Sequence, residues 1–457
     1  MGLFGTSGVR GVTGKDITSG LVERIACGFV RELDRCKSTR RLCVAHDTRE
    51  SAEGFAAIAA EHVASHGRDC DLLGVQPAGV ICNHIVASRC DGGIFVTGSH
   101  LPEGHIGIIL LDSEAGYVGG ETAERIEGYM TKRCKPQKRS GKRVESSERA
   151  IDGYIDLVKH LFPRKTRSHV AIDPCCGSAA VFANGLMREV CGLKVSAIND
   201  CRSHRFPRDP EPRAGSTLGL QRYVKKVSAR FGAAFDIDAD RVLLIDEDGV
   251  PVPEDVTGVL LAKHTLRKGE SCTAPINSNS LIEEICKKMG VRFEYCGIGQ
   301  PKIVAKMREI GASYAYEESG KYYVKHQPFA CGILTALTVA EILVDSGRPL
   351  SEHVGRFPRT FMFKKGFECE DRIKKKAMCE VLERWDDTIE ERPAKELTLE
   401  GMKKVYGDGS WVMVRASGTE PKMRIYLQGK TERRKDTLAA RADGLVKGAL
   451  ERARGAG

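Results

Sequence analysis

The sequence lacks the features that direct a chain into a membrane or out of the cell. It contains no apolar run of the length that spans a bilayer. Its first residues, MGLFGTSGVRG, do not place a basic stretch before an apolar one, so they predict no signal peptide. We therefore expect a cytoplasmic protein with no membrane partner.

Paired cysteine spacings are also missing. The 17 cysteines include no CxxC pair, and their number is odd. This pattern argues against a disulfide framework and against a zinc-binding signature. Buried, reduced thiols are the simplest expectation for such a chain.

Aromatic residues are scarce, at 6% of the chain. The most basic segment, 132–143, contains none, so it offers charge without rings that could stack on bases. The net charge of +10 is modest for 457 residues. We predict a solvated linker at 132–143 and no nucleic-acid partner, with an anionic-surface patch as the alternative.

Predicted strands alternate with predicted helices through most of the chain. One set comprises a strand at 41–47, a helix at 51–67 and a strand at 70–75, and similar sets begin near 168 and 271. The last hundred residues differ, with helices flanking two strands. Because 457 residues exceed the size of a single core, we predict several α/β domains followed by an α+β module.

Three aspartates stand at alternate positions of FDIDADRVLLIDEDG, namely Asp236, Asp238 and Asp240. In an extended segment this spacing puts the carboxylates on one side, where their repulsion calls for a cation. Oxygen ligands select a hard ion, Mg²⁺ above all. An EF-hand is excluded because Arg241 stands where that loop needs glycine. The alternative is a solvated acidic loop.

Ser99 lies in FVTGSHLPEG, where an apolar run stops at small and polar residues. A serine on a tight loop at a strand end is a candidate reacting group, and a plain turn is the alternative. A serine-hydrolase site is excluded because the flanking sequence is not GxSxG. The adjacent His100 is also poorly placed to reach the nucleophile as a base, so we expect it to play a supporting role.

Three further stretches carry groups that could hold a phosphorylated sugar. In VRASGTEPKMRIY, arginine forks, hydroxyls and a glycine N–H could close around a phosphate, or the stretch is an ordinary hairpin. In YEESGKYY, carboxylates beside Ser-Gly could accept bonds from sugar hydroxyls, although a turn is the more usual interpretation. FGTSGVRG is a turn of small residues with one arginine, and no GKS or GKT makes it a Walker A loop.

Taken in order, FGTSGVRG, TGSH-P, DxDADR, EESG and RASGTEP resemble the motifs of the α-D-phosphohexomutase superfamily, which includes phosphoglucomutase, phosphomannomutase and phosphoglucosamine mutase. The resemblance covers essentially the whole chain. It implies an α/β fold of four domains around a central cleft, three of them similar mixed-sheet α/β domains and the last α+β. We place the domains at 1–135, 150–248, 249–350 and 358–457.

The resemblance also implies a role for each motif. Ser99 would carry a phosphoryl group, and its phosphoserine oxygen would complete a Mg²⁺ site with Asp236, Asp238 and Asp240. Arg10 and Arg241 would help to neutralise the transferring phosphate, and Lys321 is a candidate acid or base. The residues expected to bind the sugar hydroxyls and the distal phosphate are Glu317, Ser319, Arg415, Ser417, Gly418, Thr419 and Arg424.

The implied reaction interconverts hexose 1-phosphate and hexose 6-phosphate through a phosphoserine and a bisphosphate, with a sugar bisphosphate as activator. Departures from the family pattern fall at Ile109, Ile237, Gly297, Lys321 and Cys331. They leave the sugar open among glucose, mannose, glucosamine and pentose phosphates. A phosphoglucosamine mutase is the first alternative, and a catalytically divergent phosphosugar-binding protein is the second. The sequence predicts no oligomeric state.

Overall fold

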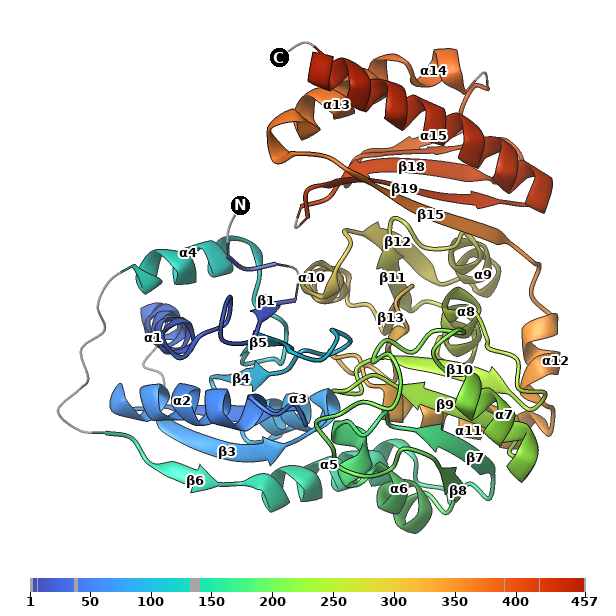
Figure 1. The fold of residues 1–457 in the computed structure, drawn as a ribbon. Helices are drawn as coiled ribbons and strands as arrows, with labels where there is room; N and C mark the ends of the chain where they lie inside the picture. Colours follow the sequence, from blue (N-terminus) through green and yellow to red (C-terminus); the bar gives the residue numbers. More distant parts are fainter. Residues whose placement is uncertain are drawn as a thin grey trace.

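The computed structural model describes residues 3–5, 7–36, 40–131, 140–389, 391–418 and 420–455. These residues form four sheets that succeed one another along the chain, each covered by helices (Figure 1). The expected α/β fold with four domains is confirmed. No helix among the described residues combines the length and apolarity needed to cross a membrane.

The first sheet has the strand order β1-β5-β4-β2-β3-β6. Strands β2, β3, β4 and β6 run parallel, and β5 is antiparallel to its neighbours. Its elements are β1 (Val9–Val12), α1 (Ser19–Cys36), β2 (Arg41–His46), α2 (Ala52–Ser65), β3 (Asp69–Val75), α3 (Ala78–Ala87), β4 (Gly92–Val96), β5 (His105–Asp112), α4 (Gly120–Met130) and β6 (Arg143–Glu145).

Strand β2 shows why this sheet is covered on both faces. Its residues alternate between two apolar clusters, Leu42 and Val44 in one and Cys43 and Ala45 in the other. Helices α1 and α2 supply the first cluster, whereas α3 and the helix α5 (Ser147–Leu161) supply the second. The strands are therefore buried on both sides, which positions the loops at their ends.

The second and third sheets repeat this plan. Their strand orders are β10-β9-β7-β8 and β12-β11-β13-β14. The second group comprises α5 (Ser147–Leu161), β7 (His169–Asp173), η1 (Ser178–Val181), α6 (Ala183–Gly185), η2 (Leu186–Val190), β8 (Lys194–Ala197), α7 (Leu218–Val227), β9 (Phe231–Phe235) and β10 (Val242–Asp246). The third comprises α8 (Glu254–Thr265), β11 (Ser271–Pro275), α9 (Leu281–Met289), β12 (Arg292–Cys296), α10 (Gln300–Ile310), β13 (Tyr314–Glu317), β14 (Lys321–Tyr323), α11 (Gly332–Ser346) and α12 (Leu350–Gly355).

The last sheet is wholly antiparallel, with the order β15-β19-β18-β17-β16. Helices α13 and α15 cover one of its faces (Figure 1). The unit comprises β15 (Phe361–Glu368), α13 (Asp371–Glu383), α14 (Trp385–Thr388), β16 (Lys395–Leu397), β17 (Met402–Val405), β18 (Trp411–Ala416), β19 (Lys422–Gly429) and α15 (Glu432–Gly455).

Four of the five predicted site motifs share one topological position. The serine loop joins β4 to β5, the aspartate loop joins β9 to β10, and the EESG turn joins β13 to β14. In each case a strand of the parallel core is connected to an antiparallel partner. The RASGTEP loop likewise joins two antiparallel strands, β18 and β19. The repeat of the fold therefore delivers one loop from each unit.

Two local expectations are changed by the structure. Strand β6, at Arg143–Glu145, joins the first sheet beside β3, although it follows directly on the predicted linker. The free cysteines of the described residues are buried apart from Cys201 and Cys379, as expected. Cys27, however, is disulfide-bonded, so the expectation of reduced thiols throughout is wrong at that position.

A buried lysine lies between the third and fourth units. Lys403 of β17 donates to the carbonyl of Ile276 at 2.7 Å, and its ammonium lies 3.9 Å from the Trp411 ring centroid. It is 1% exposed. Burial lowers the pKa of Lys403 to about 7, and Lys395 lowers it further, while Glu283 opposes the shift.

We expect Lys403→Met to remove a pH dependence of stability. Between pH 7 and 10 the unfolded chain, in which the lysine pKa is ordinary, binds a proton that the folded chain does not bind, so folding stability rises with pH. The variant lacks this rise and is more stable than the wild type at pH 6 by about 2 kcal/mol. Urea midpoints measured from pH 6 to 10 test this. The exposed Lys226→Met, on α7, is the control, and parallel pH curves for wild type and Lys403→Met would contradict the prediction.

Candidate active site

Ser99 sits in a tight turn after β4. Its φ of +47° lies in the left-handed region, which is unfavourable for a residue with a side chain. Asp47 holds the turn, because its Oδ2 accepts from Gly98 N at 3.0 Å and lies 2.8 Å from Thr97 Oγ1. The amide of Ser99 donates to Thr97 Oγ1 at 2.8 Å. The strained conformation is thus fixed by its neighbours.

Arg49 is the hub of the serine loop and was missed as a functional residue. It is 6% exposed, pairs with Asp47, and donates to the carbonyl oxygens of Ser99 at 2.9 Å and Leu101 at 2.6 Å. It also donates to Pro102 and His105 carbonyls. A Cβ on Gly98 would lie 2.3 Å from Arg49 Nε, so only glycine fits there. Arg49 lies in the segment HDTRES, residues 46–51. Only the similarity of this segment to the family could have indicated that Arg49 is functional.

We expect Arg49→Lys to reduce turnover of the enzyme by about 10²-fold, because a lysine ammonium cannot reach four carbonyls in the fork geometry of guanidinium and the loop shifts. The surface variant Arg164→Lys, whose partner Asp345 is also exposed, provides the control. Circular dichroism of both variants checks that the fold is kept. Wild-type turnover in Arg49→Lys would show that the carbonyl contacts do not position Ser99.

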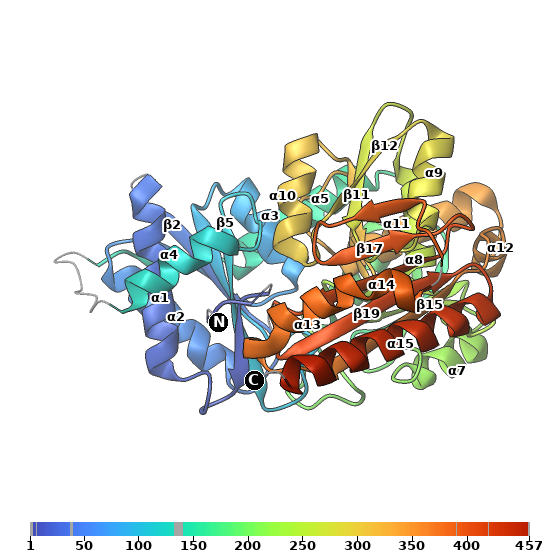
Figure 2. The same ribbon diagram turned by 90° about the horizontal axis from the view of Figure 1, so that it is seen from above.

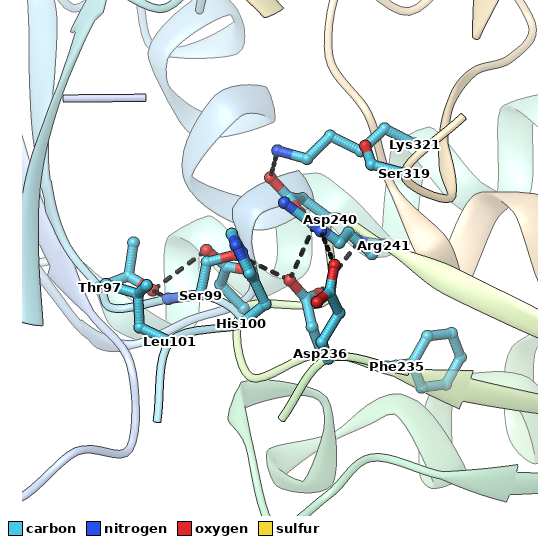
Figure 3. A network of polar contacts seen from close by, with 12 residues as sticks. Thr97, Ser99, His100, Leu101, Phe235, Asp236, Asp240, Arg241, Ser319 and Lys321 are labelled. Atoms are coloured by element: carbon cyan, nitrogen blue, oxygen red, sulfur yellow. Dashed lines mark hydrogen bonds and ion pairs between the residues drawn. The ribbon is translucent and has the colours of Figure 1, made fainter. Parts of the chain in front are cut away.

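The three aspartates lie together on the loop between β9 and β10. Figure 3 shows two of them, Asp236 in contact with Ser99 and Asp240 in contact with Lys321. All three aspartates are buried, and one carboxylate oxygen of each lies within 4.8 Å of the others. The hydroxyl of Ser99 donates to Asp236 Oδ2 at 2.8 Å. The expected extended geometry is wrong, since residues 237–240 form a turn with Ala239 at φ +55°. The three carboxylates lie close together because this turn directs their side chains toward the same point.

This cluster fits a cation. Asp238 Oδ1 and Asp240 Oδ1 are buried and have no hydrogen-bond partner among the described residues. Burial, with the charges of Asp240 and Asp236, raises the pKa of Asp238 well above its usual range. Burial and Asp240 raise the pKa of Asp236 to about 6. Carboxylates that are costly to ionise alone, with oxygens left unpaired, form a donor set for a hard metal ion.

Cationic side chains lie on the other side of the carboxylates. Lys321 Nζ donates to Asp240 Oδ2 and, at 3.1 Å, to Gln300 Oε1. Burial raises the pKa of Asp240, but Lys321 and Arg241 outweigh it, and the net shift is downward. Lys321 is therefore bound to a carboxylate oxygen of the aspartate cluster and is not free in solvent.

Arg10, Arg241 and His100 surround the serine. The Arg10 Nε is buried with no hydrogen-bond partner among the described residues, and burial, then Arg241, lowers the Arg10 pKa. Arg241 Nη1 donates to Glu211 Oε1 at 2.8 Å. His100 Nδ1 lies 3.3 Å from Ser99 Oγ, and burial together with Arg241 lowers the His100 pKa, so this imidazole is neutral at pH 7. The arrangement suits an anion beside Ser99.

A cavity of about 1220 Å³ opens above this cluster, lined by all four units. Seen from above, the first unit lies to one side and the C-terminal unit extends over the others (Figure 2). The sequence-predicted residues that line it are Arg10, His100, Arg241, Glu317, Ser319, Lys321, Gly418 and Arg424. Ser99, Asp236 and Asp240 are buried and contact side chains that line the cavity, namely His100, Arg241 and Lys321. Asp238 is buried beside Thr97.

Two predicted phosphate ligands have partners within the fourth unit, and a third lies outside the described residues. Arg415 is ion-paired with Glu400 at 2.9 Å, and the Ser417 hydroxyl accepts from Glu420 N at 3.2 Å. Neither is among the described lining residues of the cavity, and Thr419 lies outside the described part of the chain. Prediction missed the lining cations Arg213, Lys364, Lys365 and Lys422. Lys422 directly follows the TEP motif, but the two lysines of β15 have no local signal.

The departures at Ile109 and Gly297 have structural counterparts. Ile109 is buried in the core, opposite Phe95 in the sheet. A Cβ on Gly297 would lie 2.5 Å from Lys302 Cδ and 2.6 Å from Glu400 Oε1. The ion pair between Lys302 and Glu400 therefore fills the space that a longer side chain at 297 would take.

The fold and the site together define a phosphotransfer enzyme. The family models for phosphoglucomutase/phosphomannomutase α/β/α domains I, II and III match residues 1–137, 152–249 and 253–361, and the C-terminal domain model matches 367–445. The chain belongs to the phosphoglucomutase/phosphomannomutase family, and the predicted resemblance to the α-D-phosphohexomutases is confirmed.

Individual relatives match over almost their whole length. A phosphoglucomutase/phosphomannomutase from Thermococcus kodakarensis is 31% identical over 445 residues, covering 94% of this chain and 95% of the relative. A probable phosphoglucosamine mutase from Methanopyrus kandleri is 27% identical over 463 residues and covers 99% of both chains. The crystal structure of a family member from Burkholderia thailandensis has the same fold, with a TM-score of 0.86 at 22% identity over 99% of this chain and 97% of its own.

Proposed function

We propose that this protein interconverts hexose 1-phosphate and hexose 6-phosphate through a phosphoserine at Ser99 and a sugar bisphosphate. The observation that carries the proposal is the contact of 2.8 Å between Ser99 Oγ and Asp236, inside a buried carboxylate cluster with unpaired oxygens. Phosphoryl transfer depends on positioning and charge neutralisation, and both are present at this serine.

Asp236, Asp238 and Asp240 would hold Mg²⁺, with an oxygen of phosphorylated Ser99. When bound, the ion supplies the positive charge that a transferring phosphoryl group requires. The chain's own residues do the rest: Asp236 fixes the direction of the Ser99 hydroxyl, and Arg10 and Arg241 bind phosphoryl oxygens. The ammonium of Lys321 neutralises the charge of Asp240. Lys321 is therefore better suited to bind phosphoryl oxygens than to act as a general acid or base.

The far end of the substrate would lie against the third and fourth units. Glu317 and Ser319, whose side chains are hydrogen-bonded at 3.0 Å, would hold sugar hydroxyls. Gly418, Arg424 and Lys422 would hold the distal phosphate, with Arg415 and Ser417 in the same loop. Binding of that phosphate by Thr419 stays a prediction from the sequence. A cavity of about 1220 Å³ leaves room for the bisphosphate to reorient, so that its other phosphate faces Ser99.

Phosphoglucosamine mutase is the second candidate, because a relative of that name matches the whole chain. A divergent phosphosugar-binding protein is disfavoured by the intact contact between Ser99 and Asp236. The domain boundaries at 135, 150–248, 249–350 and 358, the sugar bisphosphate as activator, the cytoplasmic location and the absence of nucleic-acid and membrane partners stay predictions from the sequence.

A mutase assay over glucose, mannose, glucosamine and pentose 1-phosphates tests the function. The assay contains Mg²⁺ and a trace of the matching bisphosphate. We expect one hexose phosphate to be interconverted far faster than the others. Conversion of glucosamine phosphate alone would favour the second candidate. No conversion of any sugar, with phosphosugar binding retained, would overturn the mutase assignment.

A further inference from the structure

Two thiols that the reaction does not use lie side by side at the surface of the second unit. The sulfur atoms of Cys176 and Cys201 are 3.5 Å apart. Cys201 is exposed, and Cys176 is 6% exposed. The backbone of Cys176 forms hydrogen bonds to the residues that flank Cys201 in the sequence. Its N–H donates to Asn199 O at 2.9 Å, and its carbonyl accepts from Ser203 N at 3.3 Å. The two segments are thus held at a separation that a disulfide can bridge.

The turn that carries Cys176 supports the aspartate loop directly. Ser178 N donates to Ile237 O at 2.7 Å, and a Cβ on Gly177 would lie 2.5 Å from the same oxygen. Cys175 and Cys176 both have positive φ, at +52° and +55°, so the turn is held in an unfavourable conformation. Ile237 lies between Asp236 and Asp238. Movement of the turn is therefore transmitted to the carboxylates through one backbone hydrogen bond.

We propose that Cys176 and Cys201 form a reversible disulfide, and that this bond weakens cation binding by the aspartate loop. The second part rests on the proposed function. Closing the bond shortens the separation of the sulfurs from 3.5 Å to about 2.05 Å, which draws the 199–203 segment and the Cys176 turn together. The hydrogen bond from Ser178 N to Ile237 O shifts together with the turn.

The oxidant is a small disulfide such as oxidised glutathione. The exposed Cys201 loses its proton and attacks one sulfur, which forms a mixed disulfide and releases one small thiol. Cys176 then attacks the Cys201 sulfur and releases the second small thiol. Two protein thiols are oxidised, the small disulfide is reduced to two thiols, and each protein proton ends on a released thiol. Burial raises the pKa of Cys176 to about 11, which suits it to act second, once Cys201 has reacted.

Peptide mapping tests the bond. The intact protein is incubated with excess oxidised glutathione, its remaining thiols are alkylated, and the digest is analysed by mass spectrometry. We expect a peptide containing Cys176 joined to one containing Cys201, lost after dithiothreitol and absent in Cys201→Ser. Cys379→Ser, which removes the other exposed free cysteine of the described residues, should leave it unchanged. Cys201 found only free or joined to glutathione would overturn the proposal.

Calorimetric titration with Mg²⁺ tests the coupling without an activity assay. We expect the oxidised protein to bind Mg²⁺ at least about threefold more weakly than the reduced one, with no difference in Cys201→Ser. Equal affinities would overturn the coupling. If neither form binds Mg²⁺, the metal assignment of the proposed function fails, whereas the mapped disulfide still decides the first part of the proposal.

Discussion

Replacing Ser99 with alanine is expected to lower kcat/KM of the mutase reaction by roughly 10⁴-fold or more, the scale on which loss of a covalent nucleophile acts. The fold should survive, because the Ser99 turn is held by its backbone. Its amide donates to Thr97 Oγ1 and its carbonyl accepts from Arg49, and neither contact uses the hydroxyl. What is lost is the oxygen that faces Asp236.

Intact-mass measurement separates chemistry from binding in this variant. The wild type incubated with a sugar bisphosphate should gain the mass of one phosphoryl group, and Ser99→Ala should gain none. Ser88→Ala, at the end of α3 and away from the cavity, provides the control. A phosphorylated, active Ser99→Ala enzyme would show that the phosphate is carried by another residue.

Asp238→Asn should abolish the response to Mg²⁺, with activity reduced by about 10³-fold. Burial and two neighbouring carboxylates raise the Asp238 pKa in the folded protein. Without a metal ion, the ionised carboxylate therefore lowers the free energy of unfolding at neutral pH. This loss of stability grows as the pH rises above the pKa of Asp238 in the unfolded chain. In chelator the variant should therefore melt at or above the wild-type temperature. With Mg²⁺ at about 100 times its Kd the wild type gains about 2.7 kcal/mol, and the variant does not.

Thermal melts test this prediction: Asp238→Asn should melt at or above the wild-type temperature in chelator and below it with Mg²⁺. Asp156→Asn, on the exposed face of α5, should respond to Mg²⁺ as the wild type does. The same Mg²⁺-dependent rise in Asp238→Asn and in the wild type would contradict the metal assignment. So would full wild-type activity in chelator.

Motif order along the chain was enough to predict the four-domain fold and eight of the residues that line the cavity. It succeeded because four of the five motifs occupy the same hairpin connection, each in its own unit. It failed where a side chain's partner is set by tertiary packing. Arg415 has the expected position in its loop, yet Glu400, which precedes β17, draws its guanidinium away. Lys321 was predicted as a candidate acid or base, and only the folded chain places Asp240 against it.

Arg49 and β6 are two features that the sequence did not predict, because their contacts are also set by tertiary packing. Arg49 binds carbonyl oxygens some fifty residues ahead, and backbone carbonyls leave no mark in a sequence. Strand β6 is short, exposed and follows a basic segment, so it carries none of the apolar alternation that predicts a strand. Its pairing with β3 depends on the edge that β3 offers.

The order in which the serine loop acquires its contacts follows from their positions in the chain. Asp47, Arg49 and Thr97, which fix the turn, all precede or adjoin Ser99, whereas Asp236 comes 137 residues after it. A ribosome therefore finishes everything that shapes the turn well before it adds the first carboxylate. The nascent chain carries a formed but solvent-facing serine until the second sheet has docked on the first. Reactivity at Ser99 therefore requires the second unit, and an N-terminal fragment that ends before Asp236 would lack the carboxylate that contacts the serine.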